Sequence, residues 1–162
     1  MEIRRSVDGD WGGIWPIWHR VVAGEDTYVW PADTAEADAR RLWMLPPAAE
    51  VWVATDDGRV VATAVLKPNQ IGLGDHVANA SFMVDPEHEG VGVGRALAEV
   101  VIDRARALGY RAMQFNAVVA TNTRAIALWR SLGFVVVGIV PGSFRHRTEG
   151  HVDLLIMHRA LQ

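Results

Sequence analysis

The chain has 162 residues, with 16 basic and 19 acidic side chains, a net charge of −3 and no cysteine. At roughly 150 residues per domain this predicts one domain over residues 1–162, and the lack of cysteine excludes disulfides, cysteine-ligated metals and a cysteine nucleophile. Without basic runs, a long apolar stretch or a signal-peptide core, we expect a soluble, cytoplasmic protein with no nucleic-acid or membrane partner.

The N-terminal half predicts an edge strand over 2–7 and then two helices. Three tryptophans recur at the spacing of one helix face, namely Trp11, Trp15 and Trp18. Pro16 should kink this helix or delay its start, and Thr34 should cap the second helix. Strands are expected over 51–55, 60–66 and 76–84, the first two joined by the turn Asp56-Asp57-Gly58-Arg59.

The C-terminal half alternates helices and strands. Its expected elements are a helix over 91–108, a strand over 111–118, a helix from Thr121 or Asn122 to Ser131, and strands over 134–140 and 151–158. A loop over 141–150 should join the last two strands. This order predicts a mixed α/β sheet with a central parallel pair formed by residues 76–84 and 111–118.

Three alternating glycines, Gly90, Gly92 and Gly94, lie between a predicted strand and a predicted helix. Alternating glycines let backbone N–H groups converge, and the helix adds free N–H groups and its positive dipole end. Arg95 adds a cation. The pattern favours a phosphate site, and the alternative is a tight turn that only packs the helix. A dinucleotide loop would need glycine at position 95, and a P-loop would need Gly-Lys-Ser/Thr.

Two blocks of sequence together resemble the GNAT N-acetyltransferase superfamily. Residues 82–97 resemble its Val-x-Pro and Gln/Arg-x-x-Gly-x-Gly/Ala motif, and residues 122–134 resemble its Asn-x-x-Ala-x-x-Leu-Tyr-x-x-x-Gly-Phe motif. The resemblance covers roughly residues 50–160. It implies the GNAT fold, which is a mostly antiparallel sheet of six to seven strands with a splayed parallel pair and about four helices.

The resemblance also implies acetyl-coenzyme A as cofactor. Pantetheine would lie between the splayed strands, the pyrophosphate would rest on the glycine loop, and the N–H near Val84 would stabilise the oxyanion. The implied cofactor-binding residues are Phe82, Met83, Val84, Glu89, Gly90, Val91, Gly92, Val93, Gly94, Arg95, Asn122, Ala125 and Trp129.

Two departures from the family pattern bear on function. Glu89 replaces the usual Gln or Arg, and Val91 stands where a basic residue is frequent, so we expect weak cofactor affinity. Trp129 replaces a tyrosine that protonates the departing thiolate in many family members. Trp129 either donates a hydrogen bond to the cofactor or belongs to the core.

Asn79 and Asn116 fall on the two central strands, where asparagine is unfavourable. With neighbouring residues they are similar to the fungal acetyltransferases that detoxify azetidine-2-carboxylate and related proline analogues. That likeness implies that these asparagines orient the substrate, and the alternative is a pair of strand-bridging amides. Val84, Asn79 and Asn116 are therefore the candidate catalytic residues.

The loop between the first two helices is the other candidate for substrate binding. Thr27, Tyr28 and Trp30 could form an aromatic wall for a small ring or apolar side chain. The general base is left open among His76, His151, Asp153 and a water chain. The histidines are not clustered at metal-ligand spacing, so no metal site is expected.

The sequence predicts an acetyl-CoA-dependent N-acetyltransferase whose acceptor is a small amine, an amino acid or an analogue, that attacks the thioester directly. The alternatives are acetylation of an antibiotic or herbicide amine, and a catalytically silent acyl-CoA-binding regulatory module. The apolar C-terminal strands make a homodimer possible.

Overall fold

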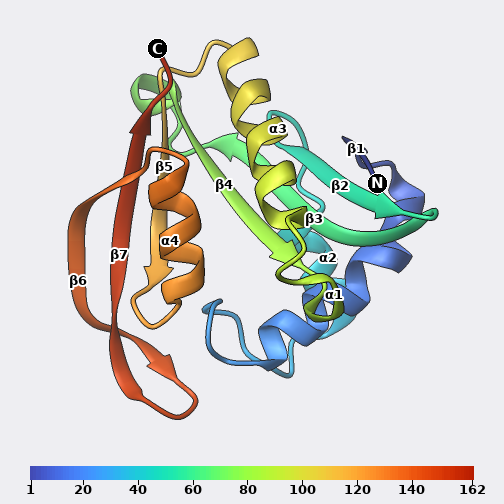
Figure 1. The fold of residues 1–162 in the computed structure, drawn as a ribbon, viewed down its shortest axis with the longest axis horizontal. Coiled ribbons are helices and arrows are strands. Elements are labelled where there is room, and N and C mark those ends of the chain that lie inside the picture. Colours follow the sequence, from blue (N-terminus) through green and yellow to red (C-terminus); the bar gives the residue numbers. More distant parts are fainter.

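The computed structural model describes residues 1–162 as one seven-stranded mixed sheet with helices on both faces (Figure 1). The sheet order is β1-β2-β3-β4-β5-β7-β6. The strands are β1 (Glu2–Arg5), β2 (Glu50–Asp56), β3 (Arg59–Pro68), β4 (Val77–Val84), β5 (Ala112–Val119), β6 (Val135–His146) and β7 (Gly150–Ala160). The helices are α1 (Trp11–Ala23), α2 (Glu36–Trp43), α3 (Val93–Ala107) and α4 (Thr123–Ser131). None of these helices is both long enough and apolar enough to span a bilayer.

Each face of the sheet has its own core. On one face, α3 and α4 bury a cluster of 22 residues that includes Leu97, Val101 and Trp129. On the other face, α1 and α2 bury a cluster of 12 residues that is rich in tryptophan. The predicted helical stripe of tryptophans accounts for this second core, in which Trp43 donates a 2.9 Å hydrogen bond to Thr63.

The central parallel pair is short. β4 and β5 pair only at Val77↔Ala112 and Ala78↔Met113, and beyond these residues the strands diverge (Figure 1). From the pair Phe115↔Met157 to the pair Val118↔Leu155, β5 advances by three residues and β7 by two, so β5 carries a bulge there. A bulge bends its strand and increases the local twist, and this one follows directly after the last pair with β4. The predicted splayed pair is confirmed.

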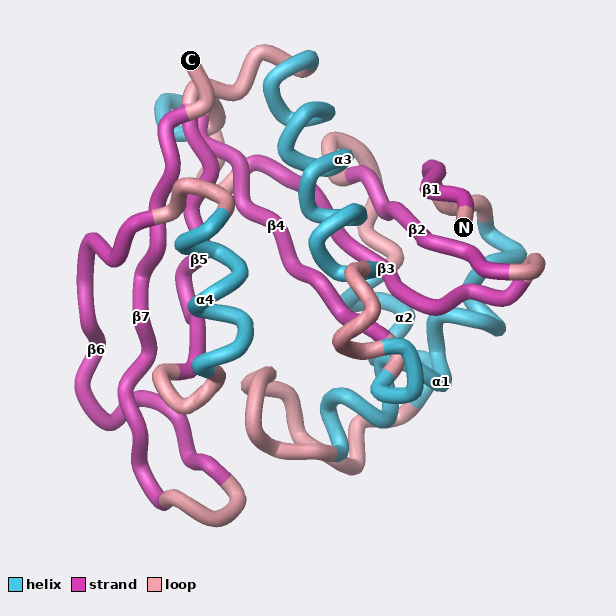
Figure 2. Tube along the Cα trace, viewed as in Figure 1, coloured by secondary structure: helices cyan, strands magenta, loops and turns pink.

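The segment between α1 and α2, residues 24–35, runs beneath the diverging ends of β4 and β5 (Figure 2). It is tied to the tip of the β6–β7 hairpin, because the Arg147 N–H donates to the Glu25 carbonyl at 3.2 Å. Two remote parts of the chain therefore meet where the sheet opens.

Three local predictions were wrong. Pro16 does not delay the start of α1, which begins at Trp11, since the proline removes only one helical bond and lies on the exposed face. Thr34 does not cap α2, because its hydroxyl donates to the Pro31 carbonyl. The expected loop over 141–150 is mostly strand, and Pro141 is accommodated at a register shift between β6 and β7.

Candidate active site

The glycine loop has a backbone that can bind an anion. Gly90 and Gly92 have φ angles of 80° and 91°, a left-handed conformation that other residues rarely adopt. Gly94 instead allows close packing, since a Cβ there would lie 3.3 Å from Cγ2 of Val84. α3 begins at Val93, so its first N–H groups have no helical partner and point toward the loop. These features support the predicted phosphate site over a simple tight turn.

The cation at this loop is not the expected one. The Arg95 guanidinium bonds to the Ser131 hydroxyl at 2.6 Å and so points along α3 toward the end of α4. Arg124 reaches the loop instead, because its Nη2 would lie 3.1 Å from a Cβ on Gly90. Its Nη1 lies 2.7 Å from Oε2 of Glu89. The Glu89 carboxylate is therefore paired with a cation, which weakens the argument that it repels phosphate.

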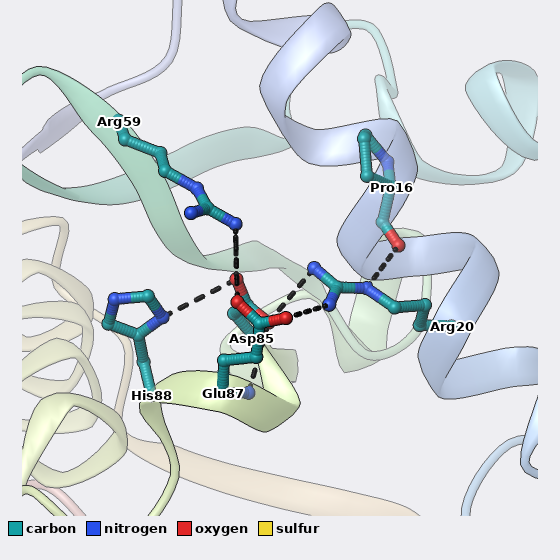
Figure 3. Close-up of polar contacts among 6 residues, drawn as sticks. All are labelled: Pro16, Arg20, Arg59, Asp85, Glu87 and His88. Atoms are coloured by element: carbon teal, nitrogen blue, oxygen red, sulfur yellow. Dashed lines mark hydrogen bonds and ion pairs between the residues drawn. The ribbon is translucent and has the colours of Figure 1, made fainter.

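A buried carboxylate holds the end of β4 in place (Figure 3). Asp85 is fully buried and accepts a hydrogen bond from the Glu87 N–H at 3.1 Å. Arg20 of α1 approaches it to 2.9 Å, and Arg59 of the β2–β3 hairpin approaches it to 3.3 Å. No role was predicted for Asp85, and the Asp-Pro pair directly after the expected strand over 76–84 was the available signal.

Asp85 joins three elements directly before the glycine loop. His88 Nδ1 also lies 3.4 Å from Oδ2 of the Asp85 carboxylate. Because a buried carboxylate is stable only when cations and donors surround it, the groups around Asp85 fix the direction in which the chain leaves β4.

The opened edge of β4 is occupied by one hydroxyl. The Tyr28 hydroxyl donates to the Phe82 carbonyl at 2.8 Å and accepts from the Phe82 N–H at 3.1 Å. Burial raises the pKa of Tyr28 well above its usual range, and the bond to the Phe82 backbone opposes this only in part. Tyr28 was expected to form an aromatic wall, and its contact with β4 was not foreseen.

Alternate residues of a strand direct their backbone groups to the same edge. Because those of Phe82 face the opening, those of Ala80 and Val84 face it too, as expected for Val84. Met83 has the opposite orientation: it pairs with Thr63 of β3 and its side chain lies in the core under α1. The structure therefore places the expected cofactor residue Met83 away from the opening.

Trp129 belongs to an aromatic cluster on the α4 side of the opening. Its ring centroid lies 4.6 Å from that of Phe115 and 5.1 Å from that of Phe82, and only 8% of the residue is exposed. Trp129 is therefore part of the core on this face of the sheet. Asn122 caps α4 by accepting from the Ala125 N–H at 3.1 Å, so it fixes the start of this helix.

The two candidate asparagines take part in an amide network across β4 and β5. Asn79 Nδ2 donates to the Gln114 carbonyl at 2.9 Å, where the strands part. Asn116 donates to the Asn69 side chain at 2.7 Å and accepts from the Gln114 side chain at 3.0 Å. Asn79 therefore bridges the strands, and the exposed Asn116 is held by side chains alone.

A cavity of about 550 Å³ lies between the 24–35 segment and the β6–β7 hairpin. Tyr28 and Trp30 line it as expected, their rings stacked at 5.1 Å, and Arg145 lines its other side. Thr27 does not line it, and its hydroxyl is buried without a hydrogen-bond partner. The possible bases His76, His151 and Asp153 are not among the lining residues.

Residues 15–134 match the model of the acetyltransferase (GNAT) family. The chain is 35% identical over 113 residues to N-acetyltransferase aca1 of Schizosaccharomyces pombe, a match that covers 68% of this chain and 54% of that protein. It thus spans about half the length of aca1. It is 30% identical over 152 residues to L-amino acid N-acyltransferase MnaT of Escherichia coli, covering 87% of this chain and 83% of that protein.

Solved structures extend the similarity to the whole fold. A GCN5-related N-acetyltransferase from Kribbella flavida is 48% identical, with a TM-score of 0.94 and coverage of 98% of this chain and 96% of that one. The yncA protein of Salmonella typhimurium, solved with its cofactor acetyl-CoA, is 26% identical, with a TM-score of 0.85 and coverage of 100% and 94%. The expected fold class is confirmed.

The Asp85 cluster yields a stability prediction. The double variant Arg20→Gln/Arg59→Gln leaves a buried carboxylate without either arginine and should lower the free energy of unfolding by about 3–5 kcal/mol. Adding Asp85→Asn removes the uncompensated charge and should restore part of that loss. Urea unfolding measures both values.

Glu87→Gln is the matched control, because Glu87 meets the same two arginines but its side chain is 64% exposed. Its effect should stay within about 1 kcal/mol. If Asp85→Asn destabilises the double variant further, the carboxylate does not act as a buried charge held by these arginines.

Proposed function

Because the chain belongs to the GNAT family of acetyltransferases, we propose that it transfers the acetyl group of acetyl-CoA to the amine of a small molecule, an amino acid or an analogue. The observation that carries this proposal is the adjacency of three features: an opened strand edge, an anion-binding glycine loop, and a cavity that shares Tyr28 with the opening. The Escherichia coli relative described as an L-amino acid N-acyltransferase supports the acceptor class.

The residues present fit acetyl-CoA. The N–H groups from Gly90 to Arg95 would hold the pyrophosphate, with Arg124 as the nearby cation. Val93 is buried, so it would contribute its N–H alone, whereas Val91 is 73% exposed. The opened edge of β4 would hold the pantetheine at Val84. Phe82, whose backbone groups are bonded to Tyr28, would contribute its ring beside Trp129, and Asn122 and Ala125 would flank the pantetheine at α4. The cofactor supplies an acetyl group activated as a thioester.

The chain's own groups would orient the amine and stabilise charge. Asn79 of β4 and Asn116 of β5 do not line the cavity and would orient the acceptor from the two strands beside it, and the Val84 N–H would stabilise the oxyanion. Trp129 lies in the core and has no acidic proton for a thiolate. A thiol similar to cysteine has a pKa of about 8.5, so the coenzyme A thiolate can leave near neutral pH without a general acid.

A small acceptor fits the cavity, whose volume is about 550 Å³. The guanidinium of Arg145, a lining residue, could pair with an acceptor carboxylate. The rings of Tyr28 and Trp30 could cover an apolar side chain or ring. This combination favours amino acids. A silent acyl-CoA-binding module would be favoured by Glu89 and by Trp129, and the pairing of Glu89 with Arg124 weakens the first of these two arguments.

A panel of amines tests the proposal through coenzyme A release. Amino acids, azetidine-2-carboxylate and proline analogues should include at least one amine that raises release above the hydrolysis blank. Release only with amino-sugar antibiotics or a phosphinothricin-like herbicide would support the drug-acetylating alternative. Release at the blank for every amine, with acetyl-CoA bound, would support the silent module.

The two asparagines provide a second test. Asn116→Ala and Asn79→Ala should each lower kcat/KM by about tenfold, the effect of losing one substrate hydrogen bond. Asn69→Ala is the control, because it removes only the side chain that Asn116 contacts. Full activity in both Asn79→Ala and Asn116→Ala, with folding intact, would show that these amides only bridge strands.

Arg124 should contribute to cofactor affinity. Arg124→Gln should weaken acetyl-CoA binding about fivefold and reduce its salt dependence, because a partly exposed charge contributes on the order of 1 kcal/mol. Arg95→Gln is the matched control and should change the affinity less, since that guanidinium is engaged by Ser131. Calorimetry measures both affinities. Weaker acetyl-CoA binding with Arg95→Gln but not with Arg124→Gln would show that Arg95 is the cation that contacts the cofactor.

We also propose a homodimer, in the cytoplasm where acetyl-CoA is available. β6 is an edge strand of the sheet, and it exposes Val135, Val137 and Ile139 by 58%, 58% and 59%. A long apolar edge is a site for pairing with another chain, and the partner proposed is a second copy. Sedimentation equilibrium measures the stoichiometry directly.

A further inference from the structure

Tyr28 connects the acceptor cavity to the opened strand. Its ring lines the cavity, while its hydroxyl makes both hydrogen bonds of the Phe82 backbone, at 2.8 and 3.1 Å. In a continuous sheet these two backbone groups would pair with β5. One hydroxyl thus stands at the junction between the cofactor edge and the acceptor cavity.

The hydroxyl is held there by packing. The Tyr28 ring stacks on Trp30 with an interplanar angle of 8° and meets Trp43 edge-on at 6.3 Å. Trp43 is buried and bonded to Thr63, so the support reaches down to β3. Because the ring is held in place, the Tyr28 side chain needs little reorganisation when negative charge develops near its hydroxyl.

The chemistry of this phenol restricts its role. Burial raises the pKa of Tyr28, so the phenol is neutral and is a weaker acid than a thiol, whose pKa is about 8.5. It is therefore unsuited to act as a base or to protonate a thiolate. It is suited to donate a hydrogen bond to an oxygen that becomes negative, and the Phe82 N–H bonded to its oxygen strengthens it as a donor.

We propose that the Tyr28 hydroxyl donates a hydrogen bond to the carbonyl oxygen of the acetyl thioester, alongside the Val84 N–H, and so stabilises the oxyanion during acetyl transfer. This assignment rests on the proposed function. To do so, the hydroxyl rotates so that its proton leaves the Phe82 carbonyl and points to the thioester oxygen. An N–H of the acceptor amine then donates to the Phe82 carbonyl.

The electron balance requires no proton transfer by Tyr28. The amine nitrogen forms a bond to the carbonyl carbon, and the carbonyl electron pair moves onto the oxygen that Tyr28 contacts. That pair then re-forms the carbonyl as the carbon–sulfur bond breaks, and coenzyme A leaves as a thiolate. The proton lost by the amine nitrogen passes through water to the thiolate.

Infrared spectroscopy of bound acetyl-CoA, labelled with ¹³C at the thioester carbonyl, tests this without an acceptor. In the wild-type protein the carbonyl band should lie at lower frequency than in free acetyl-CoA. In Tyr28→Phe, which keeps the ring and its stacking, the band should return toward the free value. Tyr110→Phe removes the only other tyrosine, outside the site, and should leave the band at the wild-type position.

Kinetics with a productive amine give a second readout. Tyr28→Phe should lower kcat about 100- to 1000-fold, the effect of removing one oxyanion donor, with little change in the affinity for acetyl-CoA. A change in KM alone would show that the hydroxyl only positions the loop, and would overturn the assignment.

If Tyr28→Phe does not fold, 3-fluorotyrosine incorporated in a Tyr110→Phe background labels position 28 alone. Its more acidic hydroxyl should move the carbonyl band further down, and an unmoved band would overturn the assignment. An unchanged band in a folded Tyr28→Phe that binds acetyl-CoA would overturn only the role of Tyr28. Failure of the wild-type protein to bind acetyl-CoA would overturn the proposed function and this assignment together.

Discussion

The early divergence of β4 and β5 is the constraint on which the rest of the site depends. Only two residue pairs join these strands, so the backbone groups of Phe82 have no partner on β5. Buried N–H and C=O groups must be satisfied, and the Tyr28 hydroxyl satisfies both groups of Phe82. The edge of β4 in the middle of the sheet thus stays unpaired with β5 beyond Ala78, with one hydroxyl in place of the missing strand at Phe82.

Separate contacts hold the two sides of the opening apart. The Asp85 cluster fixes the end of β4 against α1 and the β2–β3 hairpin, and the packing of Gly94 on Val84 brings the start of α3 beside it. On the other side, the bulge of β5 and the aromatic cluster around Trp129 support α4. Arg124 then reaches from α4 back to the glycine loop, so both sides of the opening contribute to one binding surface.

The features that the sequence predicts best are local. Alternating glycines and the Asn122 cap depend on neighbouring residues, and the parallel pair follows from the strand–helix–strand order of the chain; the structure contains all three. Predictions failed where a distant partner decides the outcome. Arg124, not Arg95, lies at the loop because α4 packs beside it, and Tyr28 contacts β4 across 54 residues of sequence. Neither contact has a periodicity or spacing that sequence reasoning could detect.

The central claim is that the opened edge of β4 and the glycine loop form one acetyl-CoA site. Backbone amide NMR of the ¹⁵N-labelled protein during an acetyl-CoA titration tests it most directly. The account predicts saturable changes at Phe82, Val84 and residues 90–95, with little change at β1 and the β2–β3 turn. Saturable binding whose changes lie elsewhere, or no binding by the folded protein at millimolar acetyl-CoA, would contradict it.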